Sequence, residues 1–145
     1  MYQHILVCLD DSEMAPIILD HAIDVADRHD ATIHIASIVD SRPWASADQY
    51  LLSNDELKER TRHDARQMVQ SYIDEKNIEG LTFDIVVEVG SPRTVITKKI
   101  APSVGADVII LGATSVRGLD HLVIGSVTSA VLNSARCDVL VVRRP

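Results

Sequence analysis

The chain has 145 residues, a formal net charge of -7 and 46% hydrophobic residues, which is typical of one acidic globular domain with a sizeable core. This composition excludes an intrinsically disordered segment, a collagen-like repeat and a small disulfide-rich scaffold. No stretch approaches the roughly 20 consecutive apolar residues of a membrane-spanning helix, and the amino terminus lacks the cationic region of a secretory signal. We therefore expect a cytoplasmic protein without membrane insertion.

The only two cysteines, Cys8 and Cys137, both lie in strand-like apolar runs. We expect them to be buried, reduced thiols that pack in the core, because this is simpler than a structural disulfide. The chain has no cluster of lysine or arginine that would attract a phosphate backbone, so nucleic-acid binding is disfavoured. Any phosphate-bearing ligand would have to be held by local groups.

Five short runs rich in valine and isoleucine recur along the chain and predict buried parallel strands. In chain order they are HILVCL (4–9), TIHIASIV (32–39), FDIVVEV (83–89), DVIILG (107–112) and DVLVV (138–142). Longer polar or amphipathic segments separate them.

Two predicted helices follow the first and second strands. The first helix, Ser12 to Arg28, repeats apolar side chains at helical spacing, and Pro16 falls in its first turn, where proline is tolerated. The second is expected to begin at Ser53, whose spacing to Glu56 is that of a capping box. One face of each helix can therefore pack on the sheet.

Two further helices are predicted in the second half of the chain. One opens with Ser91-Pro92, a cap followed by the residue best suited to the first helical position, and closes near Gly105. Pro102 is expected to kink or shorten it. The last helix begins at Ser126 and ends just before Cys137.

Alternating strands and helices give the order βαβαβαβαβ. Right-handed crossovers then favour a single α/β domain over residues 1–145, a doubly wound five-stranded parallel sheet with helices on both faces and a Rossmann-like fold. In such sheets the ligand binds beyond the carboxyl ends of the strands, where the strand order reverses. The loops after the first and fourth strands are therefore the first candidates for a binding site.

The loop after the first strand carries Asp10, Asp11, Ser12 and Glu13. Two carboxylates and a hydroxyl at this position could contact a ligand. They could also simply cap the following helix, as most isolated Asp or Ser residues before a helix do.

The segment after the fourth strand reads Gly112-Ala113-Thr114-Ser115, then nine residues, then Gly125-Ser126-Val127-Thr128 at the start of the last helix. Glycine lets the backbone approach a phosphate, and the helix N-terminus supplies oriented N–H groups with a partial positive charge. Ser126 and Thr128 add hydroxyls, so a phosphate could be held without a lysine. A Gly-Ser pair before a helix is also a common capping arrangement. Its placement opposite Asp10 in the predicted fold strengthens the binding hypothesis.

Over essentially its whole length the chain resembles the universal stress protein family. The resemblance lies in Asp10 of HILVCLDDS and in a closing segment in which GADVIILGATS leads to IGSVTSAVLNSARCDVLVVR. The nucleotide-binding branch of that family carries G-x-x-G, nine residues, then G followed by Ser or Thr. Gly112, Gly125 and Ser126 match this pattern, whereas Ser115 stands where the second glycine is expected.

The resemblance implies an adenine nucleotide alpha hydrolase-like fold that binds ATP, with Mg²⁺ carried by the phosphates. It places Asp10 on the ribose or on metal-bound phosphate, and Ile38 against the adenine. The nucleotide-binding set that it implies is Leu9, Asp10, Asp11, Ser12, Ile38, Leu111, Gly112, Thr114, Ser115, Gly125, Ser126, Val127 and Thr128. Leu111 and Val127 could equally be plain core residues.

The departure at Ser115 affects what the pocket is expected to bind. A glycine there can provide a positive φ angle or a close approach to phosphate, and serine accommodates both less readily. The serine hydroxyl can instead donate to a phosphate oxygen. The substitution could therefore weaken nucleotide binding, leave it unchanged or alter which nucleotide is preferred. ATP is the ligand that we expect first.

The family commonly forms homodimers through the last strand. Here Cys137 to Arg144 forms an apolar edge strand, which pairing across a two-fold axis would cover. We therefore expect a homodimer, and an unidentified protein partner is compatible with it. The predicted loop Ser41 to Asn54 holds the only tryptophan and is either a lid or partner surface, or a loosely packed connector.

The six histidines are scattered without metal-ligand spacing, so a zinc site is disfavoured. His121 lies with Arg117 between the two halves of the glycine motif, where it could reach a phosphate. Solvated surface residues are the simpler interpretation of both.

Three functions compete. The first is a regulatory protein in which bound ATP switches dimer state or partner choice. The second is a slow ATPase or adenylate-transferring enzyme, for which only Asp10, Asp11, Arg117 and His121 are placed to help, and neither phosphate loop holds a lysine. The third is a phosphorylated receiver, which fails because VEVGSP offers no acceptor aspartate after the third strand and no helix follows the fifth.

Other nucleotide motifs are missing from the chain. Neither the G-x-x-x-x-G-K-[ST] phosphate loop nor the G-x-G-x-x-G dinucleotide turn occurs, so P-loop and dehydrogenase functions are disfavoured. We favour the regulatory function, in which no residue is assigned a catalytic role.

Overall fold

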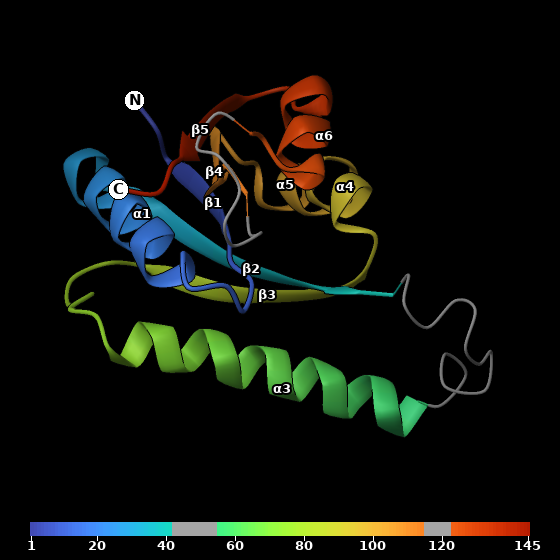
Figure 1. The fold of residues 1–145 in the computed structure, drawn as a ribbon. Coiled ribbons are helices and arrows are strands. Elements are labelled where there is room, and N and C mark those ends of the chain that lie inside the picture. The colour runs from blue at the N-terminus through green and yellow to red at the C-terminus, as the bar shows by residue number, and fades with distance from the viewer. Residues whose placement is uncertain (42–54, 115–122) are drawn as a thin grey trace.

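The structure is a computed structural model that describes residues 1–41, 55–114 and 123–145. A parallel sheet forms its centre. Its five strands lie in the order β3-β2-β1-β4-β5 (Figure 1). They are β1 (His4–Cys8), β2 (Thr32–Asp40), β3 (Phe83–Gly90), β4 (Val108–Gly112) and β5 (Asp138–Val142). The predicted doubly wound fold is therefore confirmed, and every strand bound lies within one residue of its predicted position.

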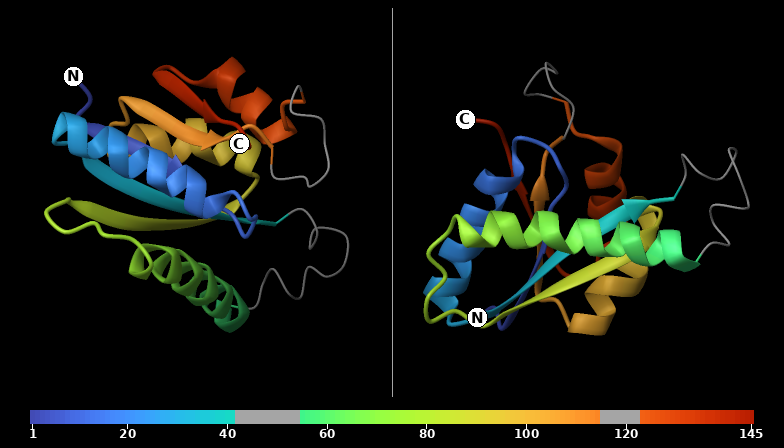
Figure 2. Two further views of the ribbon diagram at one scale, coloured as in Figure 1. Left: turned by 60° about the vertical axis from the view of Figure 1, so that its left-hand side comes forward. Right: turned by 90° about the horizontal axis from the view of Figure 1, so that it is seen from below.

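Helices cover both faces of the sheet (Figure 1 and Figure 2). On one face lie α1 (Ala15–His29) and α3 (Asp55–Asp74). On the other lie α4 (Pro92–Val95), a π-helical turn η2 (Ile96–Ile100), α5 (Ala101–Val104) and α6 (Ser126–Ser134). The strand order reverses between β1 and β4, so the loops beyond the carboxyl ends of these two strands leave a crevice.

The core consists of two apolar layers, one on each face of the sheet. Ile109 and Ile110 are neighbours in β4, both are 0% exposed, and they belong to opposite layers. Strands that are buried on both faces need continuous apolar runs, which explains why these strand sequences do not alternate. Each such side chain contributes about 1.5–3 kcal/mol relative to exposure, so the two layers stabilise the sheet whose strand ends carry the candidate site.

The first helix begins later than predicted, at Ala15 instead of Ser12. The Asp10 side chain accepts the Ser12 N–H at 2.9 Å, and the Ser12 carbonyl accepts the Ala15 N–H at 3.1 Å. These bonds form turns that keep residues 10–12 outside the helix. The N-cap is Met14, which makes no side-chain capping bond, so the alternative that Ser12 is the N-cap does not hold.

The segment predicted as one helix from Ser91-Pro92 to Gly105 changes its hydrogen-bond pattern in the middle. In a regular α-helix, the Pro102 ring would clash with the carbonyl four residues earlier. Here the preceding π turn lets the Ala101 N–H bond to the Ile96 carbonyl, five residues back. Gly105 ends the segment as predicted, with a left-handed φ of 65°. Ser91 is the N-cap but its side chain makes no capping bond.

Two remaining helix predictions concern α3 and α6. The structure describes α3 from Asp55 onward, so the predicted start at Ser53 lies outside the described residues. The last helix, α6, begins at Ser126 as predicted, with Gly125 as its N-cap, and ends at Ser134. None of the described helices is both long and apolar enough to cross a membrane.

Candidate functional site

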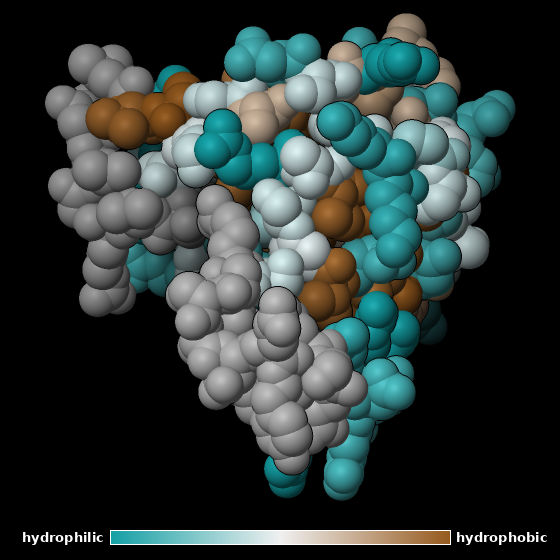
Figure 3. Space-filling view, turned by 90° about the vertical axis from the view of Figure 1, so that its right-hand side faces the viewer, coloured by the Kyte–Doolittle hydropathy of each residue, from teal (hydrophilic) through white to brown (hydrophobic). Residues whose placement is uncertain are grey.

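A pocket of about 710 Å³ opens at the carboxyl ends of β1, β2 and β4. Figure 3 views this edge of the sheet, where apolar surface is visible between hydrophilic side chains beside the grey residues. The two loops singled out from the sequence meet here, because parallel strands bring their carboxyl ends to the same edge. The predicted residues that line it are Leu9, Asp10, Asp11, Ser12, Ile38, Leu111, Gly112, Thr114, Gly125, Ser126, Val127 and Thr128.

Three predicted positions fall outside the described residues. They are Ser115, Arg117 and His121, and the predicted loop from Ser41 to Asn54 is described only at Ser41. The roles assigned to these residues stay predictions. The nucleotide contacts of the pocket-lining residues are likewise predictions, which their common location makes testable.

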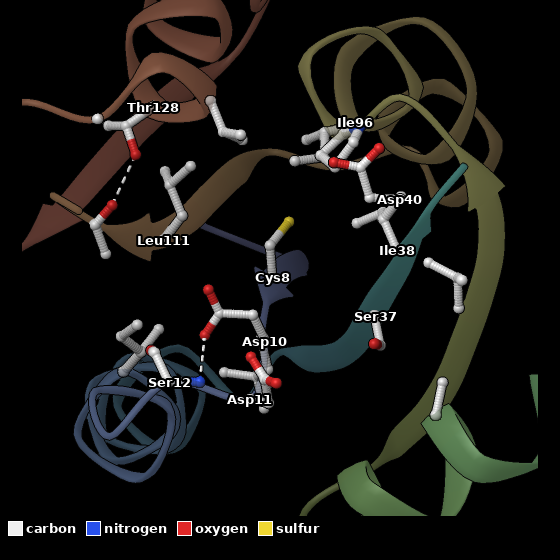
Figure 4. A pocket seen from close by; sticks show the side chains of 18 of the residues that line it. Cys8, Asp10, Asp11, Ser12, Ser37, Ile38, Asp40, Ile96, Leu111 and Thr128 are labelled. Carbon is white, nitrogen blue, oxygen red and sulfur yellow. Dashed lines mark hydrogen bonds between the residues drawn. The ribbon is translucent and has the colours of Figure 1, made fainter. Parts of the chain in front are cut away.

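The loop after β1 is held in place by hydrogen bonds on several sides. The Leu9 N–H donates to the Ala36 carbonyl of β2 at 2.9 Å. The Asp10 carboxylate accepts the Ser12 N–H, and this bond is drawn in Figure 4. The Tyr72 hydroxyl of α3 donates to the Asp10 carbonyl at 3.2 Å, across 62 positions of sequence. The Asp10 side chain is therefore fixed at the mouth of the pocket.

Tyr72 is a positioning residue that the sequence interpretation missed. Burial raises the pKa of its hydroxyl, and the carboxylates of Asp10, Asp11 and Glu75 raise that pKa further. The hydroxyl therefore keeps its proton at neutral pH and can donate to the Asp10 carbonyl. No sequence motif marks such a contact, because it depends on how α3 packs against the loop.

On the opposite side of the pocket, hydrogen bonds join the end of β4 to the start of α6. The Gly125 N–H donates to the Ala113 carbonyl at 2.7 Å, and the Thr128 hydroxyl donates to the Gly112 carbonyl at 2.6 Å. This arrangement directs the N-terminus of α6 toward the pocket, where its N–H groups favour an anion. Because the Thr128 proton is already engaged, Ser126 is the better hydroxyl donor for a ligand.

Gly125 leaves little space for a side chain. A Cβ atom there would lie 3.3 Å from the Ala113 carbonyl oxygen, 3.4 Å from Thr114 Cα and 3.5 Å from Thr114 Oγ1. Its φ of -66° is open to any residue. Glycine therefore allows Ala113 and Thr114 to pack closely here, and it is not needed for an unusual backbone angle. A β-branched side chain would crowd the segment that joins the two halves of the motif.

The wall between β2 and β4 is mostly apolar. Figure 4 shows Cys8, Ile38, Ile96 and Leu111 around one part of the pocket. Leu111 is 4% exposed and belongs to the core as well as to this wall, so its core role is confirmed and its nucleotide contact stays a prediction. A flat, apolar ring is the kind of group that such a wall accommodates.

Cys8 contributes to the apolar wall as a neutral thiol. Burial raises the pKa of this thiol to about 12, so it is not a thiolate nucleophile at neutral pH. Cys8 and Cys137 are both free, as predicted, and both are partly buried.

The structure adds lining residues that the sequence interpretation assigned elsewhere. One stripe of α3 faces the pocket, and residues of β2 and the start of α4 complete the lining. The added residues include Ser37, Val39, Asp40, Thr61, Asp64, Ala65, Met68, Pro92 and Ile96. Spacing of three and four residues on α3 could have identified a shared helix face, but it does not show what that face contacts.

The electrostatic character of the lining is acidic. Asp10, Asp11, Asp40 and Asp64 line the pocket, whereas no lysine or arginine does so among the described residues. The described residues also hold no group of three or more His, Cys, Asp or Glu side chains placed to bind a metal ion. Among the described lining residues, the groups that could contact a phosphate favourably are backbone N–H groups and hydroxyls.

Sequence comparison and structure comparison both relate this chain to universal stress proteins. The model of the Universal stress protein family matches residues 1–143. The Staphylococcus epidermidis protein SERP1273, whose name assigns it to the universal stress proteins, is 34% identical over 143 residues, covering 98% of this chain and 84% of that protein.

Solved structures with the same fold extend the comparison. The protein MJ0577 is 30% identical with a TM-score of 0.83, covering 100% of this chain and 98% of that one. A universal stress protein solved in complex with cAMP is 20% identical with a TM-score of 0.63, covering 97% of this chain and 96% of that one. With the family model matched along nearly its whole length, the chain belongs to the universal stress protein family.

Proposed function

We propose that this chain binds ATP in the pocket, with Mg²⁺ on the phosphates, and that the bound nucleotide switches dimer state or the choice of a protein partner. The observation that carries the proposal is the meeting of Asp10 with Gly112 and the start of α6 at one pocket. The neighbour solved with cAMP has the same fold and holds an adenine nucleotide.

The lining suggests how the nucleotide would lie. The adenine would pack against Ile38 and Ile96, and the phosphates would point to Gly112 and the N-terminus of α6. Asp10, between these ends, would accept hydrogen bonds from the ribose hydroxyls or contact the cation on the phosphates. Each part of the ligand thereby meets groups of suitable chemistry.

The acidic lining explains the need for Mg²⁺. Without a cation, the carboxylates of Asp10 and Asp11 would repel a triphosphate. Mg²⁺ prefers oxygen ligands and usually keeps phosphate oxygens and water, so carboxylate and Ser126 hydroxyl oxygens suit it. When bound, the ion would neutralise phosphate charge, while backbone N–H groups of α6 orient the phosphates.

The edge strand β5 is tied directly to both halves of the pocket. The Val142 carbonyl at the end of β5 accepts the Ala113 N–H at 2.8 Å, and Ala113 in turn binds Gly125. Arg144, just after β5, pairs with Glu13, next to the Asp10 loop. If β5 is the dimer strand, these hydrogen bonds and this ion pair connect the nucleotide pocket to the dimer interface through few residues. This connection supports a switch in which bound nucleotide alters dimerisation.

A slow ATPase is the second candidate, since Asp10 or Asp11 could orient a water molecule near the phosphates. The described lining offers no basic side chain to stabilise a transferring phosphoryl group, which favours binding over turnover. We also propose a cytoplasmic location, where the free thiols of Cys8 and Cys137 would stay reduced.

The test begins with freshly purified protein that is gently denatured, followed by chromatography of any released small molecule. We expect the released molecule to be ATP. We also expect that ATP incubated with the native protein for hours is not hydrolysed. Steady conversion of ATP to ADP would put the ATPase candidate ahead. A different released ligand would refute ATP as the occupant.

Tyr72→Phe should weaken ATP binding because the Asp10 carbonyl loses its donor from α3. One hydrogen bond of this kind contributes about 0.5–1.5 kcal/mol, so the dissociation constant should rise roughly threefold to tenfold. Tyr2→Phe is the matched control, because the Tyr2 hydroxyl donates to Asp138 at 2.8 Å at the start of β5, and Asp138 does not line the pocket. Equal ATP affinity for both variants, measured by calorimetry, would remove Tyr72 from the site.

A further inference from the structure

The two edges of the sheet are strands β3 and β5. An edge strand presents unpaired N–H and C=O groups that can accept a strand from another molecule. The β3 sequence FDIVVEV is rich in residues of high β-propensity, and Phe83 is 37% exposed. Left open, this edge would be a place for two copies of the chain to join.

Two arginines of α3 reach the outer edge of β3. Arg62 Nη1 donates to the Val87 carbonyl at 3.0 Å, and Arg66 Nη2 lies 3.5 Å from the Ile85 carbonyl. The helix itself packs on the sheet face through Val69 and Ile73, both of which are buried (Figure 1 and Figure 2). Its arginines therefore extend from a helix that is already anchored.

The carbonyls that they contact are those that face away from β2. In a parallel ladder, alternate residues of an edge strand point their main-chain groups to the neighbour, and the others point outward. The Ile33 N–H of β2 bonds to the Thr82 carbonyl, so even-numbered carbonyls of this strand face β2. Ile85 and Val87 belong to the outward set, which an added strand would use.

The spacing of the arginines matches the spacing of these carbonyls. Four residues along a helix span about 6 Å, and two residues along a strand span about 6.6 Å. Arg62, the earlier arginine in the chain, contacts Val87, and Arg66 contacts the earlier residue Ile85. This reversed order fits a helix that runs antiparallel to the strand. Successive turns of α3 can therefore occupy successive outward carbonyls.

From this match we propose that Arg62 and Arg66 close the β3 edge to strand addition by a second copy of the chain. Guanidinium donors occupy acceptors that a docking strand requires, and their charge opposes burial under that strand. Edge-to-edge assembly is thereby restricted to β5. A chain with one open edge can form a closed pair but cannot extend into a filament.

The test replaces both arginines with alanine, as R62A/R66A, and measures mass against concentration by light scattering. The variant should form species larger than those of the wild type, in a concentration-dependent way. The change takes the formal net charge from -7 to -9, which by itself opposes association. Arg60→Ala with Lys98→Ala is the charge-matched control, since both side chains are exposed and should leave the mass unchanged.

Two more variants make the outcome specific to the edge. Arg62→Ala alone should have a larger effect than Arg66→Ala alone, because its hydrogen bond is 0.5 Å shorter. Adding Phe83→Lys to R62A/R66A should suppress the larger species, because a lysine on the same edge blocks strand addition. If the double alanine variant loses the native circular-dichroism spectrum, R62M/R66M replaces it in the test, because methionine favours a helix but carries neither a charge nor a donor. This variant should likewise form species larger than those of the wild type.

A folded R62A/R66A variant with the wild-type mass at every concentration would overturn the proposal. The same holds for a folded R62M/R66M variant if it is the one tested. The result does not depend on nucleotide binding or on dimerisation through β5. A monomeric wild type whose arginine variant associates would contradict the proposed dimer but would support the closed β3 edge.

Discussion

Gly125→Val should reduce ATP affinity by roughly 100-fold, equivalent to about 2.7 kcal/mol. A Cβ at this position already lies 3.3 Å from the Ala113 carbonyl oxygen, and the two methyl groups of valine extend further toward Thr114. Relieving that contact would displace the N-terminus of α6, whose N–H groups are the proposed phosphate donors. The loss should appear in calorimetric titration with ATP and Mg²⁺.

Gly125→Ala is the graded control for this variant. A lone Cβ needs its neighbours to shift by only a few tenths of an ångström, so its effect on affinity should be much smaller. Both variants should keep the far-ultraviolet circular-dichroism spectrum, because Gly125 is an N-cap with ordinary backbone angles. Wild-type ATP affinity in folded Gly125→Val would move the nucleotide site elsewhere.

Val141→Lys should convert the proposed dimer to monomers. Val141 pairs with Leu111 in the β4-β5 ladder and is only partly buried within one chain, on the edge strand that a partner would cover. A lysine there would have to lose water in the interface, so dimerisation should weaken roughly 100-fold or more. Sedimentation velocity at micromolar concentration would detect the change.

Phe83→Lys is the matched control because it places the same charge on the opposite edge of the sheet. Phe83 is 37% exposed, so the substitution should be tolerated without changing the sedimentation of the wild-type state. A Val141→Lys protein that still sediments as a dimer would exclude β5 as the interface.

The fold was predictable because its strand signal is strong and local. Runs such as DVIILG are short, continuous and bounded by polar segments, and their burial on both faces leaves few other arrangements. Topology then brings Asp10 and Gly125 to the same pocket although 115 positions separate them in the chain. The strand pattern, together with the rule that ligands bind beyond the carboxyl ends of parallel strands where the strand order reverses, was sufficient to predict that these two residues lie close together.

Features that depend on competing local bonds were not predictable. Ser12 and Ser91 look like side-chain caps, yet Ser12 lies before the N-cap Met14, and Ser91 is the N-cap without a side-chain capping bond. In these turns the Asp10 carboxylate and the Ser12 and Ser91 carbonyls accept the N–H groups instead. The π turn before Pro102 is likewise a compromise between a helical pattern and a proline ring. Propensity describes each residue separately and does not rank such alternatives.

The α3 wall of the pocket was missed for a different reason. Asp64 lies in a charged run, from Glu56 to Arg66, that also fits an ordinary solvated helix face, and much of that helix is in fact exposed. Only the packing angle of α3 decides that Thr61 and Asp64 line the pocket and that Arg62 reaches β3. Side-chain direction of this kind requires the three-dimensional structure.

Calorimetric titration of nucleotide-free protein with ATP in the presence of Mg²⁺ tests whether the pocket binds this nucleotide. We predict saturable binding with one ATP per chain, and much weaker binding when the divalent cation is removed, because the acidic lining would repel the bare triphosphate. Absence of binding heat, with no ATP retained in equilibrium dialysis, would refute ATP binding and leave a universal stress protein that acts through protein contacts alone.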